Sequence, residues 1–197
     1  MPRDKLSEAI ARFDAANTED PNQELIEGRE RPKELVYAER MSAWLDRLAP
    51  DASDVVRLAV RAQHIRRWSI PRDSYPMDRA GYRKWRIELG KFHAETAGEI
   101  LRDVGHDEKT VTRVQSLLRK ERLKADPEVQ LLEDVACLVF LNHYFADFAA
   151  KHDEAKLVNI VRKTWRKMSS QGQAAARGLA LPADLEAILA RALGQAG

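Results

Sequence analysis

The most apolar stretch of the chain is Val129-Gln-Leu-Leu-Glu-Asp-Val-Ala-Cys-Leu-Val-Phe-Leu-Asn-His-Tyr-Phe145. At helical spacing, both faces of this stretch carry mainly aliphatic or aromatic side chains. A helix that is apolar all round is typical of a protein core, so the stretch predicts a buried central helix. Asp134 lies within it. A buried Asp134 would need a cation, a metal or several donors, whereas an exposed Asp134 would suit the first turns of the helix.

Outward from this stretch, nearly every segment has helical periodicity, and none alternates convincingly as a strand. Helices are expected over 3–17, 33–48, 54–68, 79–104, 108–122, 127–150, 153–168 and 183–194. Segments rich in proline, glycine and polar residues predict loops over 18–32 and 70–78, and a linker over 171–181. The pattern predicts one all-α domain over 1–197, a helical bundle of about seven to nine helices.

The composition is that of a soluble globular protein. The chain has 197 residues, of which 44% are hydrophobic and 32% charged, and its net charge is +2. With so small a charge, any basic function must be local. The single cysteine, Cys137, excludes an internal disulfide and a cysteine-rich metal site. No signal peptide or membrane-spanning run is evident, so we expect a cytoplasmic protein without a membrane partner.

Polar side chains recur on the apolar faces of successive predicted helices. Gln63 and His64 close one helix, His93 shares a face with Leu89 on another, and Arg40 shares a face with Trp44. Each has a structural alternative, since such a histidine is often a hydrogen-bonded core residue and such an arginine often snorkels to solvent. Their recurrence in one small chain favours a shared polar site.

The order of these segments resembles the HD-type phosphohydrolase superfamily, which is all-helical and binds one or two divalent metals. Tyr37-Ala-Glu-Arg-Met41 resembles its first motif, with Arg40 at the first histidine, and Gln63-His64 stand at its His-Asp pair. Phe92-His-Ala-Glu-Thr96 resembles the segment with a later histidine, matched by His93, and Asp134 stands at the late aspartate. The resemblance implies an HD-like core over about 34–150 and phosphoester hydrolysis.

The departures from the HD pattern bear on metal binding. Arg40 is a permanent cation where that family has a ligand, and Gln63 is a poor ligand for a transition metal. His64, His93 and Asp134 remain as a catalytic and metal-binding set, since two imidazoles and a carboxylate suit zinc or iron. We therefore expect one divalent metal at less than stoichiometric occupancy, or its replacement by the charge of Arg40.

The whole chain also resembles a bacterial and fungal domain family of unknown function. The resemblance is carried by Gln63-His-Ile-Arg-Arg-Trp68 and by Leu132-Glu-Asp-Val-Ala-Cys-Leu-Val-Phe-Leu141. It implies no activity.

Residues 66–86 form the strongest local excess of positive charge, with seven basic, two acidic and four aromatic residues. Arginine binds phosphate bidentately, and aromatic rings stack on bases. Arg67 and Arg72, with Lys120, are the expected phosphate clamps beside Arg40 and Gln63. The alternative is a solvated basic helix start.

The leading functional hypothesis is an HD-like phosphohydrolase, or a degenerate relative, that binds a phosphorylated small molecule or nucleotide. A second hypothesis is a non-catalytic protein that binds RNA, including tRNA, through residues 66–86. A third is a helical interaction protein.

Overall fold

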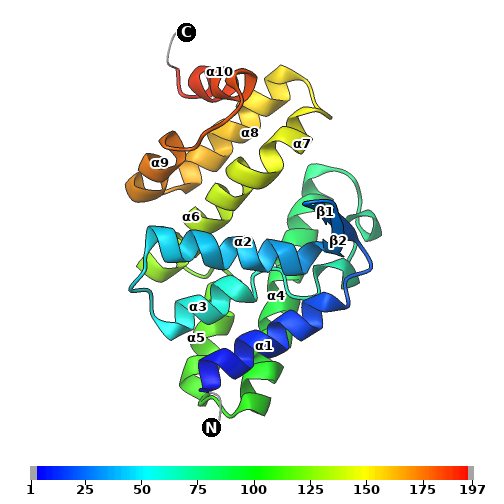
Figure 1. The fold of residues 1–197 in the computed structure, drawn as a ribbon, viewed down its shortest axis with the longest axis vertical. Coiled ribbons are helices and arrows are strands. Elements are labelled where there is room, and N and C mark those ends of the chain that lie inside the picture. Colours follow the sequence, from blue (N-terminus) through cyan, green and yellow to red (C-terminus); the bar gives the residue numbers. More distant parts are fainter. Residues whose placement is uncertain (1–3, 195–197) are drawn as a thin grey trace. The chain divides into compact units, whose positions relative to one another are not determined.

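The computed structural model describes residues 4–194, so residue 3 of the first predicted helix lies outside the described part. The fold is all-α, as predicted, with one small antiparallel hairpin (Figure 1). Its elements are α1 (Lys5–Thr18), β1 (Gln23–Ile26), β2 (Arg29–Pro32), α2 (Lys33–Leu48), α3 (Asp54–Arg61), α4 (Arg79–Val104), α5 (Glu108–Leu118), α6 (Pro127–Val139), α7 (Phe145–Ala149), α8 (Glu154–Lys167), α9 (Ser170–Arg177) and α10 (Ala183–Ala192).

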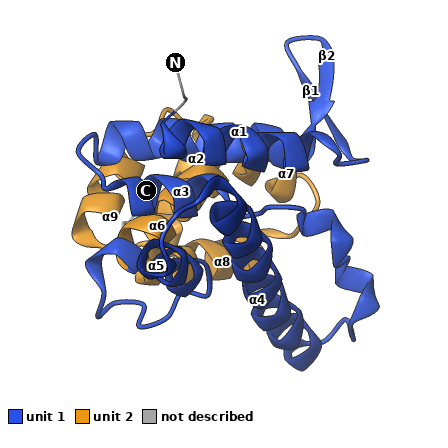
Figure 2. Cartoon of the chain, turned by 90° about the horizontal axis from the view of Figure 1, so that it is seen from below, with its two compact units in different colours: residues 1–129 blue, residues 130–197 orange. Residues whose placement is uncertain are grey.

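Contacts divide the chain into two compact units, Met1–Val129 and Gln130–Gly197, which Figure 2 shows in different colours. In the first unit, α1 to α5 surround a core whose largest fully buried side chains are Phe13, Met41, Leu45, Leu58, Ile65, Leu89, Leu101 and Leu117. In the second unit, α8 packs on α10, and both bury leucines at their contact faces, Leu157 and Leu185.

Side-chain caps define where several helices begin. Asp78 accepts a hydrogen bond from the backbone N–H of Gly81 at 2.7 Å at the start of α4, and Asp107 accepts one from Thr110 at 2.8 Å at the start of α5. Such caps satisfy backbone donors that have no partner inside the helix. Helix α4 ends at Gly105, whose φ of 88° suits glycine. These boundaries agree with the sequence prediction.

The hairpin lies in a segment predicted to be a loop. Its two turn residues, Glu27 and Gly28, have φ angles of 50° and 78°, as a two-residue turn of type I′ requires. Ile26 pairs with Arg29 across that turn. The strands are short and largely polar, so their sequence lacks the alternation by which a half-buried strand is recognised.

Other differences concern helix boundaries. The predicted helix over 54–68 ends at Arg61, and the predicted helix over 127–150 is divided by a π-helical turn, η3 (Phe140–Tyr144). Helix α9 lies in the predicted linker, where Ser169 caps it by accepting from the backbone N–H of Gly172. These changes raise the number of α-helices to ten in residues 4–194, above the predicted seven to nine.

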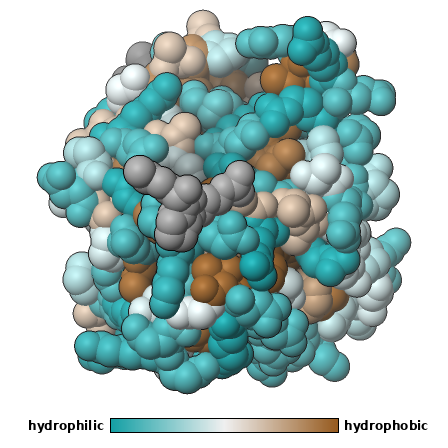
Figure 3. Space-filling view, turned by 60° about the horizontal axis from the view of Figure 1, so that its bottom comes forward, coloured by the Kyte–Doolittle hydropathy of each residue, from teal (hydrophilic) through white to brown (hydrophobic). Residues whose placement is uncertain are grey.

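The described helices include none that is long and apolar enough to cross a lipid bilayer. The face seen in Figure 3 is mainly hydrophilic, and its hydrophobic residues form small separate patches.

Candidate functional site

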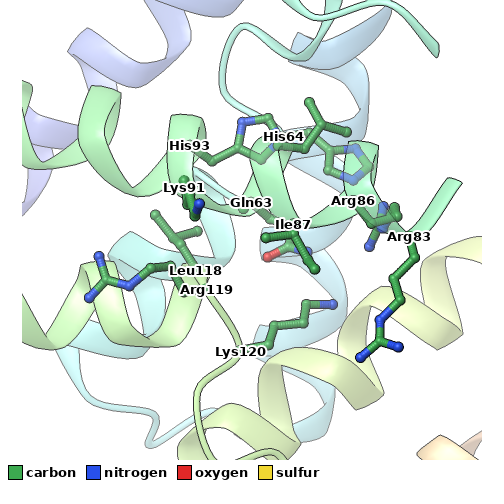
Figure 4. Close-up of a pocket in the computed structure, with 12 residues that line it drawn as sticks. Gln63, His64, Arg83, Arg86, Ile87, Lys91, His93, Leu118, Arg119 and Lys120 are labelled. Atoms are coloured by element: carbon green, nitrogen blue, oxygen red, sulfur yellow. The ribbon is translucent and has the colours of Figure 1, made fainter. Parts of the chain in front are cut away.

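The first unit contains a cavity of about 320 Å³. It is bounded by α4, the turn that follows α3 and the end of α5 (Figure 4). Its lining consists of Gln63, His64, Arg83, Arg86, Ile87, Leu89, Gly90, Lys91, His93, Leu118, Arg119 and Lys120. Five of these residues are arginine or lysine, and none is acidic. Two of the five have partners outside the lining, since Lys91 pairs with Glu88 at 3.1 Å and Arg119 pairs with Glu121 at 2.6 Å. The lining therefore gives the cavity a positive potential, and we call it the basic pocket.

Helix α4 supplies one whole side of the basic pocket. Arg83, Arg86, Gly90 and His93 are spaced by three or four residues and therefore share one face of the helix. The start of α4 is fixed by Gly81, because a Cβ at that position would lie 2.0 Å from the carbonyl oxygen of Pro76. The preceding loop thus holds the basic face of α4 in place.

Lys120 comes from the turn that ends α5. Its N–H donates to the carbonyl of Leu117 at 2.9 Å, and the N–H of Glu121 donates to that of Ser116 at 3.2 Å, which is a Schellman motif. The position that glycine usually takes in this motif is occupied here by Lys120, with φ 55°. Figure 4 shows its side chain extending toward the space bordered by Gln63 and Arg83. The positively charged side chain of Lys120 is therefore presented to the pocket by a residue whose backbone conformation is strained.

Two residues of the pocket lining, Gln63 and His93, carry buried acceptor atoms. His93 is 4% exposed, and its Nδ1 lies 2.8 Å from the carbonyl oxygen of Ile65. Because a carbonyl only accepts, Nδ1 carries the proton and Nε2 of the neutral ring is an acceptor. No described group donates to that Nε2, nor to the Oε1 of Gln63, whose residue is 5% exposed.

His64 is held by contacts on both ring nitrogens. Its Nε2 lies 3.0 Å from Nη1 of Arg67, which can only donate, so Nδ1 carries the proton and donates to Oε2 of Glu34 at 3.2 Å. The ring also stacks on Tyr37, with centroids 3.9 Å apart. His64 and His93 lie side by side, with ring centroids separated by 5.9 Å.

Burial determines the charges of these groups. It lowers the pKa of His64 well below its ordinary value, and the positive charge of Arg67 adds to this effect. Burial lowers the pKa of His93 to about 3, although its bond to Ile65 opposes the shift. Burial also raises the pKa of Glu34 to about 7, against the influence of Arg67. At neutral pH both imidazoles are uncharged, and the positive charge of the pocket comes from arginine and lysine.

The side chains of the pocket do not provide the ligands that a metal site of the HD type needs. Both nitrogens of His64 are engaged, by Glu34 and by Arg67. The residues described by the structure include no group of three histidine, cysteine, aspartate or glutamate side chains able to hold a metal ion. The structure thus brings together His64 and His93 of the predicted metal set, in an environment of fixed cations that opposes a dication.

Asp134 does not line the pocket and has structural partners in the second unit. It is 2% exposed, and its carboxylate accepts from the backbone N–H of Ser169 at 2.7 Å, from the hydroxyl of the same residue and from the side chain of Gln130 at 3.0 Å. A Cβ at position 172 would lie 2.7 Å from Cγ of Asp134, so Gly172 allows α9 to approach it. The buried interpretation of Asp134 is correct, but its described partners are hydrogen-bond donors and not a cation.

Three predicted phosphate-binding residues do not line the pocket. Arg40 pairs with Glu24 at 2.6 Å. Arg67 donates to Nε2 of His64, and its guanidinium group lies over the ring of Trp85, 4.8 Å from the ring centroid. Arg72 donates to the backbone carbonyls of Tyr75, Pro76 and Asp78. The guanidinium groups of these three arginines donate to acceptors within the protein, so they are poorly placed to bind a phosphate in the pocket. Of the other two residues predicted to bind the substrate, both Gln63 and Lys120 line the pocket.

The prediction missed Arg83, Arg86, Lys91 and Arg119 as lining residues and Glu34 as the partner of His64. For Arg83 and Arg86 a signal exists, since both share the helical face of His93. For Glu34 no sequence signal exists, because its pairing with His64 depends on how α2 packs against α3.

A family model described as a domain of unknown function (DUF4202) matches residues 7–189. No curated protein and no solved structure was found to match the chain. The predicted membership of a full-length family of unknown function is therefore confirmed, while the relationship to HD phosphohydrolases stays a prediction. Because the match covers nearly the whole chain, the protein belongs to the family described as a domain of unknown function, DUF4202.

Proposed function

We propose that the protein binds a phosphorylated small molecule or nucleotide in the basic pocket. The observation that carries this proposal is the lining, which combines five basic side chains with no acidic one in a single cavity. Arg83 and Arg86 offer guanidinium groups that bind phosphate oxygens bidentately, and Lys120 offers a point charge opposite them.

The dimensions of the pocket favour a small ligand. Its volume of about 320 Å³ is at the lower end of the range for small-molecule sites. RNA binding was predicted to use residues 66–86, but Arg72 is bonded to carbonyls of its own loop and Arg66 is paired with Glu19 at 2.6 Å. Fewer cations of this stretch are therefore available to a polynucleotide than its composition implied.

The geometry supports binding better than phosphoester hydrolysis. A general base needs a pKa near the working pH. The free acceptor of the pocket, Nε2 of His93, belongs to a ring whose pKa is lowered to about 3, and Nε2 of His64 already accepts from Arg67. Neither ring is well suited to remove a proton from water at neutral pH.

The proposal is tested by thermal unfolding of the wild type, Lys120→Gly and Lys124→Gly in the presence of phosphate, sulfate and a panel of nucleotides and phosphorylated metabolites. Lys124 also has a positive φ, 74°, but does not line the pocket, so it is a matched control. A ligand at a hundred times its Kd stabilises the folded state by about 2.7 kcal/mol.

We expect stabilisation of the wild type and of Lys124→Gly, and a clearly smaller stabilisation of Lys120→Gly. Equal stabilisation of all three proteins would contradict the assignment of the pocket. Salt-dependent binding of RNA, without a response to any small phosphorylated compound, would instead support the RNA-binding hypothesis.

A further inference from the structure

The basic pocket has two kinds of polar lining, and the phosphate accounts for only one of them. The side chains of Arg83, Arg86 and Lys120 are donors that suit an anion. The Nε2 of His93 and the Oε1 of Gln63 are acceptors, buried and without a described donor. Buried polar atoms are paired in the great majority of cases, so two unpaired acceptors in one cavity need an explanation.

A fully ionised phosphate group cannot satisfy these acceptors, because its oxygens carry negative charge and also accept. A neutral donor suits the lining better than an ammonium group, which Arg83 and Arg86 would repel. A hydroxyl group meets both conditions. Ile87, which is 50% exposed, together with Leu118, offers apolar surface for a short carbon skeleton between the two ends.

We propose that the ligand is an organic phosphate that also bears hydroxyl groups, such as a sugar phosphate or a polyol phosphate, with a hydroxyl donating to Nε2 of His93 or Oε1 of Gln63 while the phosphate binds Arg83, Arg86 and Lys120. This inference rests on the proposed function and names its ligand class. The tautomer of His93 supports it, because the carbonyl of Ile65 holds the proton on Nδ1, which leaves Nε2 of the neutral ring as an acceptor.

The experiment compares two ligands that differ in hydroxyl groups alone. Glycerol phosphate and propyl phosphate carry the same phosphoester and the same number of carbons. Their affinities are measured by isothermal titration calorimetry with the wild type, with inorganic phosphate as a third ligand. A site with unpaired acceptors rejects a ligand that lacks the matching donor, so we expect glycerol phosphate to bind about ten-fold more tightly than propyl phosphate, or more.

The variant Gln63→Met removes one acceptor at nearly constant volume. We expect it to reduce the preference for glycerol phosphate over propyl phosphate several-fold. His93→Met is the second variant, and its melting temperature shows whether the loss of the bond to Ile65 disturbs the fold. Lys120→Gly is the opposite control, because it should weaken both ligands equally and keep the preference between them.

The outcomes separate this inference from the function on which it rests. Equal binding of glycerol phosphate and propyl phosphate to the wild type would overturn the hydroxyl inference and leave phosphate binding intact. A preference that survives unchanged in both Gln63→Met and folded His93→Met would also overturn it. If none of the three ligands binds, and a ribose phosphate also fails to bind, the proposed function and the inference both fall.

Discussion

The Nδ1 atom of His93 lies 2.8 Å from the carbonyl oxygen of Ile65, in the turn that follows α3. This contact joins α4 to that turn and decides the chemistry of the basic pocket. The proton is held on Nδ1 by Ile65, so the buried Nε2 of the same ring is an acceptor. A buried neutral ring among arginine and lysine side chains also has a measurable effect on stability.

The first prediction concerns His93→Gln and acid. The pKa of His93 is lowered from 6.5 to about 3, chiefly by burial. Between these values the unfolded chain binds a proton that the folded state does not, so the free energy of unfolding falls as the pH falls. Between pH 6.5 and 4 the wild type should lose on the order of 3 kcal/mol more than the variant. Urea unfolding across this range checks it, and parallel curves for the two proteins would refute it.

Glu34 should have the opposite effect. Burial raises its pKa from 4.5 to about 7, so the folded state keeps a proton that the unfolded chain has lost. The contribution is present below pH 4.5 and is lost as the pH rises through 7. In Glu34→Gln this loss disappears, and its stability should fall by roughly 2–3 kcal/mol less than that of the wild type between pH 5 and 8. An unchanged pH dependence would show that Glu34 is ionised throughout.

Two substitutions at Lys120 separate the effect of its backbone strain on stability from the effect of its charge. Its φ of 55° is disfavoured by a Cβ atom, so Lys120→Gly should raise the free energy of unfolding without ligand by about 0.5–1 kcal/mol, while Lys120→Ala should not. Melting temperatures of the three proteins in an anion-free buffer test this order. If the glycine variant melts below the alanine variant, the positive φ is not a source of strain.

Asp134→Ala should destabilise the protein without changing its response to anions. The substitution leaves the donors of Ser169 and Gln130 without their acceptor, at a cost of about 1–3 kcal/mol for the buried groups. The stabilisation by phosphate, measured as the difference in melting temperature with and without it, should equal that of the wild type. A loss of that stabilisation in a folded variant would return Asp134 to the ligand site.

Arg72→Ala should likewise leave the anion response intact. Arg72 donates to the carbonyls of Tyr75 and Pro76, and its guanidinium lies 5.8 Å from the ring centroid of Trp85. Its removal should loosen the loop over 70–78 and accelerate limited proteolysis there. An unchanged cleavage rate together with a lost response to phosphate would instead make Arg72 a phosphate clamp.

The fold was predictable where the sequence carries helix signals. Asp107 and Gly105 mark the boundary between α4 and α5, because one caps a helix start and the other permits a left-handed end. The end of α5 was not predictable, since the left-handed residues after it are Lys120, Arg122 and Lys124 rather than glycines. Side chains of this kind give no sign of a turn.

Part of the candidate site could be predicted from the sequence, and for a physical reason. Polar residues on apolar faces, such as His93 and Gln63, conflict with their surroundings, and that conflict is visible in the sequence. The local density of positive charge in the sequence was less useful for predicting which residues line the pocket. Arg67 and Arg72 belong to the most basic stretch, yet their guanidinium groups face internal acceptors that only the folded chain brings near.

The most direct test of the basic pocket is to follow the five histidine side chains by NMR while glycerol phosphate is added. His64 and His93 line the pocket, whereas His106, His143 and His152 do not. The account predicts saturable shifts of the ring signals of His64 and His93 and little change at the other three. In Lys120→Gly, the shifts of His64 and His93 should saturate only at a higher concentration of glycerol phosphate. Shifts confined to the other histidines, or no saturable shift at His64 and His93 with glycerol phosphate, ribose phosphate or inorganic phosphate, would contradict it.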